Sequence, residues 1–291
     1  MIAMGGNSIS PKGGTGRIEE QFERTREAFD GISHFIKRGY NLCINHGNGP
    51  QVGNEIMRME LTQDTVPPLP LGVCVASTQG SIGYMIQQCL QNKLREMEID
   101  REVVTLVSQV IVDKNDDSFK EPTKYIGKRY TKQEADEMTT DFGWYFKEQE
   151  EGKYRRVVPS PMPEYIMHGK SIKALVDRGT IVIASGGGGI PVYNNSLGKL
   201  EGLDAVIDKD YSAAKMGRII RAHELWIITD VDAVYKNFGS SNQKRVSSMT
   251  KKEAEKLYNE GLFQKGSIAP KVRAAIHFLK HHGNKVIITS I

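Results

Sequence analysis

Short apolar runs alternate with helix-like segments along the whole chain of 291 residues. The apolar runs lie at 2–4, 42–44, 103–112, 180–184, 225–229 and 285–291, and helical patterns lie at 18–39, 50–60, 77–98, 165–177, 210–222, 251–259 and 270–282. Strands separated by helices pair in parallel through right-handed crossovers, with helices on both faces of the sheet. The pattern predicts an α/β fold, a three-layer αβα sandwich around a mainly parallel sheet.

One stretch interrupts this alternation. The sequence from Asp113 to Pro163 is rich in charged, aromatic and proline residues and has little clean helical period. A long segment of this kind inside a compact domain is commonly functional. We expect a small, protruding, lid-like subdomain at about 113–163, within a chain divided into lobes 1–165 and 166–291.

Composition excludes several protein classes. The chain has 39 Lys and Arg against 35 Asp and Glu, a net charge of +4 that is too small to indicate a nucleic-acid partner. Its three cysteines form no CxxC pair, so neither a disulfide framework nor a zinc site is indicated. No apolar window approaches the ~18 residues of a membrane span. We expect a cytoplasmic protein that binds neither membrane nor nucleic acid.

Three glycine clusters each follow directly on an apolar run. They are Gly5-Gly6-Asn7, His46-Gly47-Asn48-Gly49 and Ser185-Gly186-Gly187-Gly188-Gly189. The carboxyl ends of parallel strands form the ligand crevice of an open sheet, and glycine there lets backbone N–H groups approach an anion. A single glycine pair is usually a plain turn. Three clusters in one sheet favour a site for phosphate or another oxyanion.

The familiar phosphate motifs are absent. Gly169-Lys170-Ser171 resembles the end of a P-loop, but Glu164 stands where the upstream glycine is required. Gly47-Asn48-Gly49 begins a dinucleotide fingerprint, but Val52 stands at the third glycine position. The catalytic loop of protein kinases is also missing. A nucleotide would have to be bound by another architecture.

Two lysines stand where phosphoryl transfer needs cations. Pro270 suits a first helical turn, which places Lys271 beside the positive end of the helix dipole, where a lysine is unfavourable. Asp208-Lys209-Asp210 opens another predicted helix, and first-turn capping explains the acids but not the lysine between them. Taken alone, Lys271 is more plainly interpreted as a solvated lysine.

Other candidates are weaker. His46 has no partner at metal-ligand spacing, so a loop histidine is the better interpretation, and no metal ligand is predicted. Ser185 lacks the Gly-x-Ser-x-Gly elbow of a serine nucleophile. The basic run 153–156 could contact RNA, but an exposed strand face is more common.

In their order along the chain, these segments resemble carbamate kinases of the amino-acid-kinase superfamily. The motifs that carry the resemblance are 3–7 (AMGGN), 46–53 (HGNGPQVG), 122–124 (PTK), 155–161 (RRVVPSP), 185–192 (SGGGGIPV), 206–210 (VIDKD) and 266–271 (GSIAPK). The resemblance implies a homodimer that transfers a phosphoryl group reversibly between ATP and carbamate, giving ADP and carbamoyl phosphate. It also implies that cells often run the reaction towards ATP, at the end of arginine catabolism. Mg²⁺ would arrive with ATP or ADP.

The resemblance also implies residue roles. Lys209 and Lys271 would neutralise the β- and γ-phosphates, Asp210 would hold both lysines, and Lys124 would reach carbamoyl phosphate from the lid. Substrate-lining residues would be Gly5, Gly6, Asn7, Gly47, Asn48, Gly49, Ser185, Gly186 and Gly187. Nucleotide-binding residues would be Asp208, Lys209, Asp230, Val231, Asp232, Val234, Tyr235, Gly266, Ser267 and Lys271.

Two alternatives stay open. An acetylglutamate- or uridylate-type kinase would share the fold, although the 113–163 segment and Pro122-Thr123-Lys124 argue against it. A non-catalytic sensor of nucleotide or carbamoyl phosphate would not need lysines at all three positions.

Overall fold

The computed structural model of the chain describes residues 1–10, 13–264, 268–281 and 283–290. A six-stranded parallel sheet lies at its centre, in the order β15-β12-β1-β2-β9-β3. The strands are β1 (Ile2–Met4), β2 (Cys43–His46), β3 (Val103–Leu106), β9 (Ile181–Ala184), β12 (Glu224–Ile228) and β15 (Lys285–Thr289). The predicted α/β fold with a mainly parallel sheet is confirmed.

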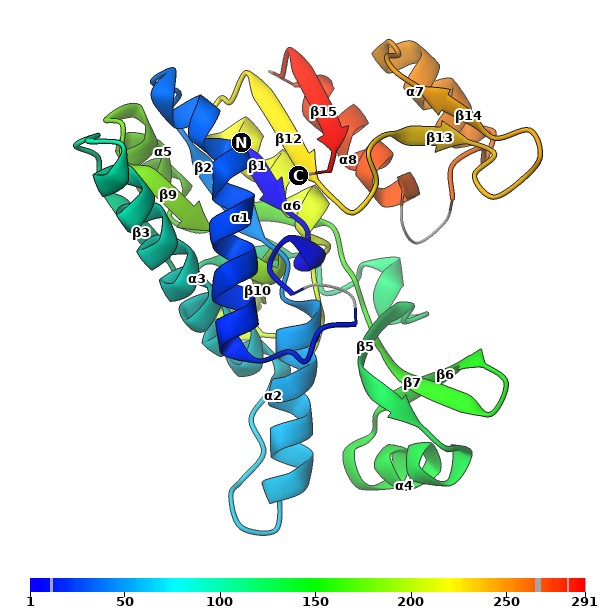
Figure 1. Cartoon of the computed structure of the whole chain (residues 1–291). Helices are drawn as coiled ribbons and strands as arrows, with labels where there is room; N and C mark the ends of the chain where they lie inside the picture. The colour runs from blue at the N-terminus through cyan, green and yellow to red at the C-terminus, as the bar shows by residue number, and fades with distance from the viewer. Residues whose placement is uncertain (11–12, 265–267, 282, 291) are drawn as a thin grey trace.

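Helices cover both faces of this sheet (Figure 1). On one face lie α1 (Ile18–Lys37) and α3 (Leu71–Glu96), and on the other lie α5 (Gly169–Asp177), α6 (Lys209–Ile219) and α8 (Ile268–Leu279). Side chains alternate along each strand, so Ile2 packs on the first face and Ala3 on the second. Two apolar cores therefore hold the three layers together.

A second sheet is formed by strands that follow β3 and β9 along the chain. It has the order β11-β10-β4-β8, with β4 (Gln109–Val112), β8 (Pro163–Ile166), β10 (Ile190–Asn194) and β11 (Leu200–Gly202). The expectation of one strand over 103–112 was therefore wrong, because the chain changes sheets at Ser108. The amide oxygen of Gln79 accepts from Ser108 N at 2.7 Å, and Gln79 Nε2 donates to Ser108 O at 3.2 Å. The Gln79 side chain thus pairs with the backbone of Ser108, whose carbonyl also accepts from Ile190 N of β10 at 2.9 Å.

Helix boundaries also differ from the expected ones. The helix expected from residue 77 begins at Leu71, whose N–H donates to Asp204 Oδ1 at 3.2 Å from 133 residues away. The helix expected from residue 165 begins only at Gly169, because Tyr165 and Ile166 belong to β8, which pairs with β4. The intervening helix α2 covers Gly49–Thr62. These differences come from long-range contacts that local patterns do not contain.

The segment between β4 and β8 protrudes from the body (Figure 1). Its antiparallel sheet has the order β5-β7-β6, from β5 (Lys124–Tyr130), β6 (Tyr145–Glu150) and β7 (Lys153–Val158), with α4 (Lys132–Phe142) beside it. We call residues 124–158 the protruding subdomain. The unpredicted α4 carries a capping box between Thr131 and Glu134 and ends at Gly143, signals that were present in the sequence. The lobe boundaries at 165 and 166 stay a prediction.

The remaining elements are short. They are the 3₁₀ turns η1 (Gly6–Ser8), η2 (Asp117–Phe119) and η3 (Gly186–Gly188), the hairpin β13 (Val234–Lys236) and β14 (Lys244–Val246), and α7 (Lys251–Asn259). The hairpin and α7 lie beside α8 at the carboxyl-terminal side of the sheet (Figure 1). No helix in the described parts of the chain is both long and apolar enough to cross a bilayer.

Candidate active site

A pocket of about 580 Å³ opens at the carboxyl ends of the central strands, where the sequence places its glycine clusters. Its lining includes parts of the main body, the protruding subdomain and the region of β13. The lining residues are Gly5, Gly6, Gly47, Asn48, Gly49, Pro50, Val52, Lys124, Tyr125, Ile126, Arg155, Gly187, Val206, Ile207, Asp208, Lys209, Asp210, Thr229, Asp230, Val231, Ala233, Tyr235, Phe238, Gln264, Ile268, Pro270 and Lys271. Segments distant in sequence thus meet in one concave site.

Three helices begin at this pocket. The first residues of α2 (Gly49), α6 (Lys209) and α8 (Ile268) all line it. The N-terminus of a helix carries unpaired N–H groups and a partial positive charge. The convergence favours an anionic ligand, and phosphate groups bind such positions readily.

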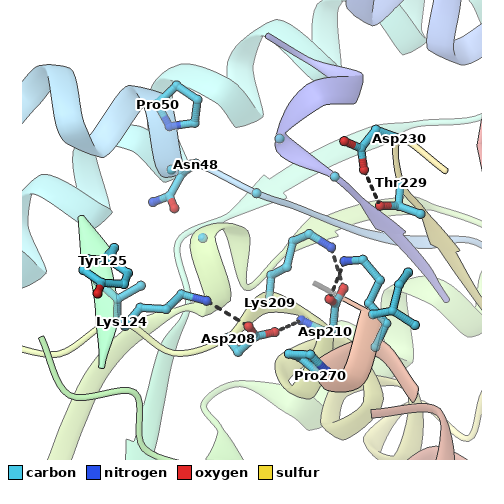
Figure 2. Close-up of a pocket in the computed structure, with 18 of the residues that line it drawn as sticks. Asn48, Pro50, Lys124, Tyr125, Asp208, Lys209, Asp210, Thr229, Asp230 and Pro270 are labelled. Atoms are coloured by element: carbon cyan, nitrogen blue, oxygen red, sulfur yellow. Dashed lines mark hydrogen bonds and ion pairs between the residues drawn. The ribbon is translucent and has the colours of Figure 1, made fainter. Parts of the chain in front are cut away.

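Two ammonium groups meet at one carboxylate on the pocket floor (Figure 2). Lys209 Nζ lies 2.5 Å from Asp210 Oδ1, and Lys271 Nζ lies 2.9 Å from Asp210 Oδ2. Asp210 is only 3% exposed, and each lysine side chain is 14% exposed. Because an ammonium has three N–H donors, each lysine keeps donors for a ligand. The predicted position of Lys271 in the first turn of α8 is confirmed.

Burial and charge shift the pKa values of this group. Burial raises the pKa of Asp210, but the ammonium groups of Lys209 and Lys271 outweigh that effect and hold it well below its ordinary value. Burial lowers the pKa of Lys209, opposed by the Asp210 carboxylate and reinforced by Lys271. The carboxylate therefore stays ionised and keeps two like charges side by side.

The protruding subdomain supplies a third lysine. Lys124, the first residue of β5, donates from Nζ to Asp208 Oδ2 at 2.8 Å (Figure 2). Asp208 is also the N-cap of α6, because its Oδ1 accepts from Asp210 N at 2.9 Å. The capping interpretation of Asp208 is confirmed. One side chain thus connects the subdomain to the helix that carries Lys209.

The glycine loops approach one another too closely for side chains. A Cβ on Gly47 would lie 3.0 Å from Gly6 N and 3.5 Å from Lys209 Cδ. Gly187 has a φ of +65°, and a Cβ there would lie 2.2 Å from Asn48 Nδ2. Asn48 in turn donates from Nδ2 to Thr78 Oγ1 at 2.8 Å. Glycine at these positions lets the loops and Asn48 pack around the pocket.

Asp230, Val231 and Tyr235 also line the pocket. Thr229 lines it beside them, and its hydroxyl donates to Asp230 Oδ1 at 3.2 Å (Figure 2). Polar and aromatic groups therefore share the pocket with the lysines.

Some predicted residues lie elsewhere. Ser185 and Gly186 are fully buried and do not line the pocket. Asp232 accepts from Tyr235 OH at 3.0 Å outside the lining, and Val234 is packed in an apolar cluster. Asn7 lies in η1, next to the lining glycines, and Gly266 and Ser267 lie outside the described residues.

Two earlier interpretations need correction. His46 is no loop residue, because it ends strand β2 and is only 1% exposed. The basic run 153–156 is no solvent-exposed strand face, because Arg155 is half-buried in the pocket and Arg156 is buried on the other side of β7. Alternation along the strand sends the two arginines to opposite faces.

Several lining residues were not predicted. Arg155 and Tyr125 follow from the subdomain's position against the body, whereas Phe238 and Gln264 belong to loops without a motif. The one available signal for Arg155 was that it is the first residue of the 155–161 motif. Within the described residues, no group of three or more His, Cys, Asp or Glu side chains is placed to hold a metal ion.

A family model supplies the deciding comparison, since the amino acid kinase family matches residues 1–290. The chain belongs to this family. Carbamate kinase from Pyrococcus horikoshii is 42% identical over 293 aligned positions, covering 100% of this chain and 93% of the relative. Carbamate kinase 2 from Staphylococcus epidermidis is 43% identical over 296 positions, with the same coverage.

Within the amino acid kinase family, a solved structure agrees with these relatives. Carbamate kinase from Giardia lamblia bound to AMP-PNP has a TM-score of 0.93 and 36% identity, covering 99% of this chain and 92% of the other. The resemblance to carbamate kinases and the amino-acid-kinase fold are both confirmed.

Proposed function

We propose that this protein catalyses reversible phosphoryl transfer between ATP and carbamate, giving ADP and carbamoyl phosphate. The observation that carries the proposal is the pairing of Lys209 and Lys271 on Asp210 inside a glycine-lined pocket. The similarity to carbamate kinases over the full chain supports the choice of substrates. One relative, from Giardia lamblia, is described as bound to AMP-PNP, which supports a nucleotide in this pocket.

The chemistry follows from charge. Carbamate is already an anion, so its oxygen attacks phosphorus without a general base, and the barrier is mainly the approach of two anions. Cations and N–H donors aimed at the transferring group lower such a barrier, and loss of one can cost on the order of a hundredfold in rate. Lys209 and Lys271 would neutralise the phosphates, and Asp210 would keep both ammonium groups positioned.

The remaining roles are assigned by position in the pocket. Gly5, Gly6, Gly47, Asn48 and Gly49 would surround the transferring phosphoryl group and carbamate. Lys124 would leave Asp208 for the carbamoyl phosphate end of the substrate. Asp230, Val231 and Tyr235 would border the nucleotide. Mg²⁺ would enter as part of the nucleotide substrate, where it offsets phosphate charge.

The oligomeric state, the cellular compartment and the direction of the reaction belong to the same proposal. We infer a homodimer, as the resemblance to carbamate kinases implies, with the exposed Val73 and Tyr84 of α3 as candidates for its interface. Cys43, Cys74 and Cys89 are all free, which supports a reducing compartment such as the cytoplasm. Synthesis of ATP at the end of arginine catabolism is the direction that we infer.

A coupled assay of ATP formation from ADP, carbamoyl phosphate and Mg²⁺ tests the proposal. We expect turnover by the native chain and a loss of about a hundredfold or more in Lys209→Ala and Lys271→Ala. Lys251→Ala is the matched control, because Lys251 is an exposed lysine in the first turn of another helix, α7. Circular dichroism checks that each variant is folded. Near-normal ATP synthesis in both pocket variants would contradict the proposal, as would a native chain that uses acetylglutamate or uridylate instead.

A further inference from the structure

A second cavity, of about 220 Å³, lies between the protruding subdomain and the main body. The body contributes the end of α2 and the loop before α3, and the subdomain contributes residues next to α4 and on β7. The lining residues are Ile56, Met59, Glu60, Gln63, Pro68, Leu69, Pro70, Leu71, Phe142, Trp144, Arg156 and Asp204. None of them lines the first pocket.

Arg156 is the unusual member of this lining. It is 5% exposed, and its guanidinium lies 3.8 Å from the centre of the Trp144 ring. The nearest carboxylate oxygen, Asp204 Oδ2, is 3.7 Å from Arg156 Nη2, which is too far for a hydrogen bond. In the described part of the chain, Arg156 donates no hydrogen bond to a protein group.

A buried guanidinium without acceptors is unfavourable. Arginine carries five N–H donors and stays charged in proteins. Burial lowers the pKa of Arg156, against the opposing effect of Asp204. Within the described residues, none of its nitrogen atoms is both fully enclosed and unpaired, so its free N–H groups take their acceptors from what fills the cavity, either water or a ligand.

The other charged groups at the cavity already have partners. Glu60 accepts from the Tyr130 hydroxyl and lies 3.2 Å from Lys128 Nζ. Asp204 accepts from Leu71 N and is largely exposed to solvent. Arg156 is therefore the charged group whose donors remain available to a ligand.

We propose that this cavity binds a small, flat organic carboxylate. Its two oxygens accept from Arg156, whose planar fork matches a carboxylate. Its body packs beside Phe142 and Leu69, where the rings of Phe142 and Trp144 are stacked with centroids 5.0 Å apart. The cavity is smaller than the roughly 300–1,000 Å³ of typical ligand pockets, which limits the ligand to a small molecule.

The position gives such a ligand contact with both parts of the molecule. Arg156 and Phe142 belong to the subdomain, whereas Leu69 belongs to the body. The residue before Arg156 on β7 is Arg155, which lines the first pocket. The inference does not depend on the reaction proposed above, because it concerns binding at a separate cavity.

The binding test uses 4-fluorobenzoate as the probe, observed by ¹⁹F NMR, with the neutral 4-fluorobenzamide for comparison. We expect saturable binding of the carboxylate and at least tenfold weaker binding of the amide. Arg156→Lys keeps the positive charge but removes the planar guanidinium that can donate to both carboxylate oxygens. Leu69→Trp fills the cavity with a larger side chain without altering Arg156. Both variants are expected to weaken binding tenfold or more.

Matched controls separate this cavity from the first pocket. Arg129→Lys changes an exposed arginine of the same subdomain, and Leu61→Trp changes an exposed leucine at the end of α2 outside the lining. Both controls and Lys271→Ala are expected to bind the probe as the native chain does. Hydrogen exchange should slow on binding in peptides that contain residues 68–71 and 142–144.

Three outcomes would overturn the proposal. They are equal binding of acid and amide, binding that survives both Arg156→Lys and Leu69→Trp, and binding that disappears in Lys271→Ala. The last outcome would assign the probe to the first pocket. A fourth outcome, the absence of any binding up to millimolar probe, would also overturn it, because water alone would then satisfy Arg156.

Discussion

Lys271 donates to Asp210 across 2.9 Å, although the two residues are 61 positions apart and lie in the first turns of different helices. Lys209 contacts the other oxygen of the same carboxylate. A single buried anion thus keeps two ammonium groups together at the pocket floor. Opposite charges within this distance stabilise one another strongly only when the carboxylate is ionised.

Asp210→Asn should therefore reduce both stability and activity. The substitution leaves Lys209 and Lys271 adjacent without their counter-charge, and breaking a buried pair in this way costs about 3–5 kcal/mol. We expect a lower free energy of unfolding in urea and turnover reduced about a hundredfold. Asp177→Asn, at an exposed helix pair with Lys173, is the control and should change neither quantity. Native-like turnover in Asp210→Asn would contradict the positioning role.

Lys124→Ala should reduce turnover while leaving nucleotide binding nearly unchanged. Lys124 reaches the pocket from the subdomain, on the side away from Asp230, which we propose borders the nucleotide (Figure 2). We expect a loss on the order of a hundredfold in ATP formation. ADP affinity, measured by calorimetry, should change less than about threefold.

Lys147→Ala is the matched control for Lys124→Ala. Lys147 stands on β6 of the same subdomain and pairs with Glu121 at 3.4 Å, at the protein surface. Equal effects of the two substitutions would indicate a general disturbance of the subdomain and contradict a specific role for Lys124.

Gly187→Ala should destabilise the protein more than Gly198→Ala. Both glycines have positive φ, +65° and +72°, so both substitutions introduce backbone strain of about 1–2 kcal/mol. A Cβ on Gly187 also collides with Asn48, whereas nothing lies within 4 Å of a Cβ on Gly198. We expect about 3 kcal/mol or more for Gly187→Ala in chemical denaturation. Equal losses would show that Asn48 moves away without cost.

Stability should fall as the pH drops from about 6.5 to 4, partly because of His46. Burial lowers the pKa of His46 from 6.5 to about 4. Between these values the unfolded chain binds a proton that the folded chain does not, so the free energy of unfolding decreases with falling pH. Above pH 6.5 neither state binds this proton, so His46 makes its full contribution to the free energy of unfolding. Below pH 4 both states bind the proton, so this contribution changes no further. The difference amounts to on the order of 3 kcal/mol.

The comparison with His46→Gln isolates this contribution. His277, whose pKa burial also lowers to about 4, is present in both proteins and cancels in the difference. Urea unfolding at several pH values should give a smaller slope for the variant between pH 4 and 6.5. An NMR titration of His46 with a midpoint near 6.5 would contradict the prediction even if the variant did not fold.

Much of the architecture could be predicted because its signals are local. Alternating strands and helices, the glycine clusters after strands and Pro270 at the start of α8 depend on neighbouring residues only. Helix α4 could also have been found from Thr131 and Glu134. The start of α3 could not, because the N–H of its first residue, Leu71, donates to Asp204, far along the chain.

By itself, the sequence determined the α/β layering, the glycine turns at the strand ends, the capping acid of α6 and the similarity to carbamate kinases. The first three follow from periodicity and turn chemistry, which depend on neighbouring residues. The last follows from the order of motifs along the chain. Only the tertiary structure decided that the chain changes sheets at Ser108, that Lys209 and Lys271 share Asp210, and that Arg155 and Arg156 serve different cavities. These features depend on pairing, burial and charge between segments distant in sequence, and such contacts exist only once the layers have packed.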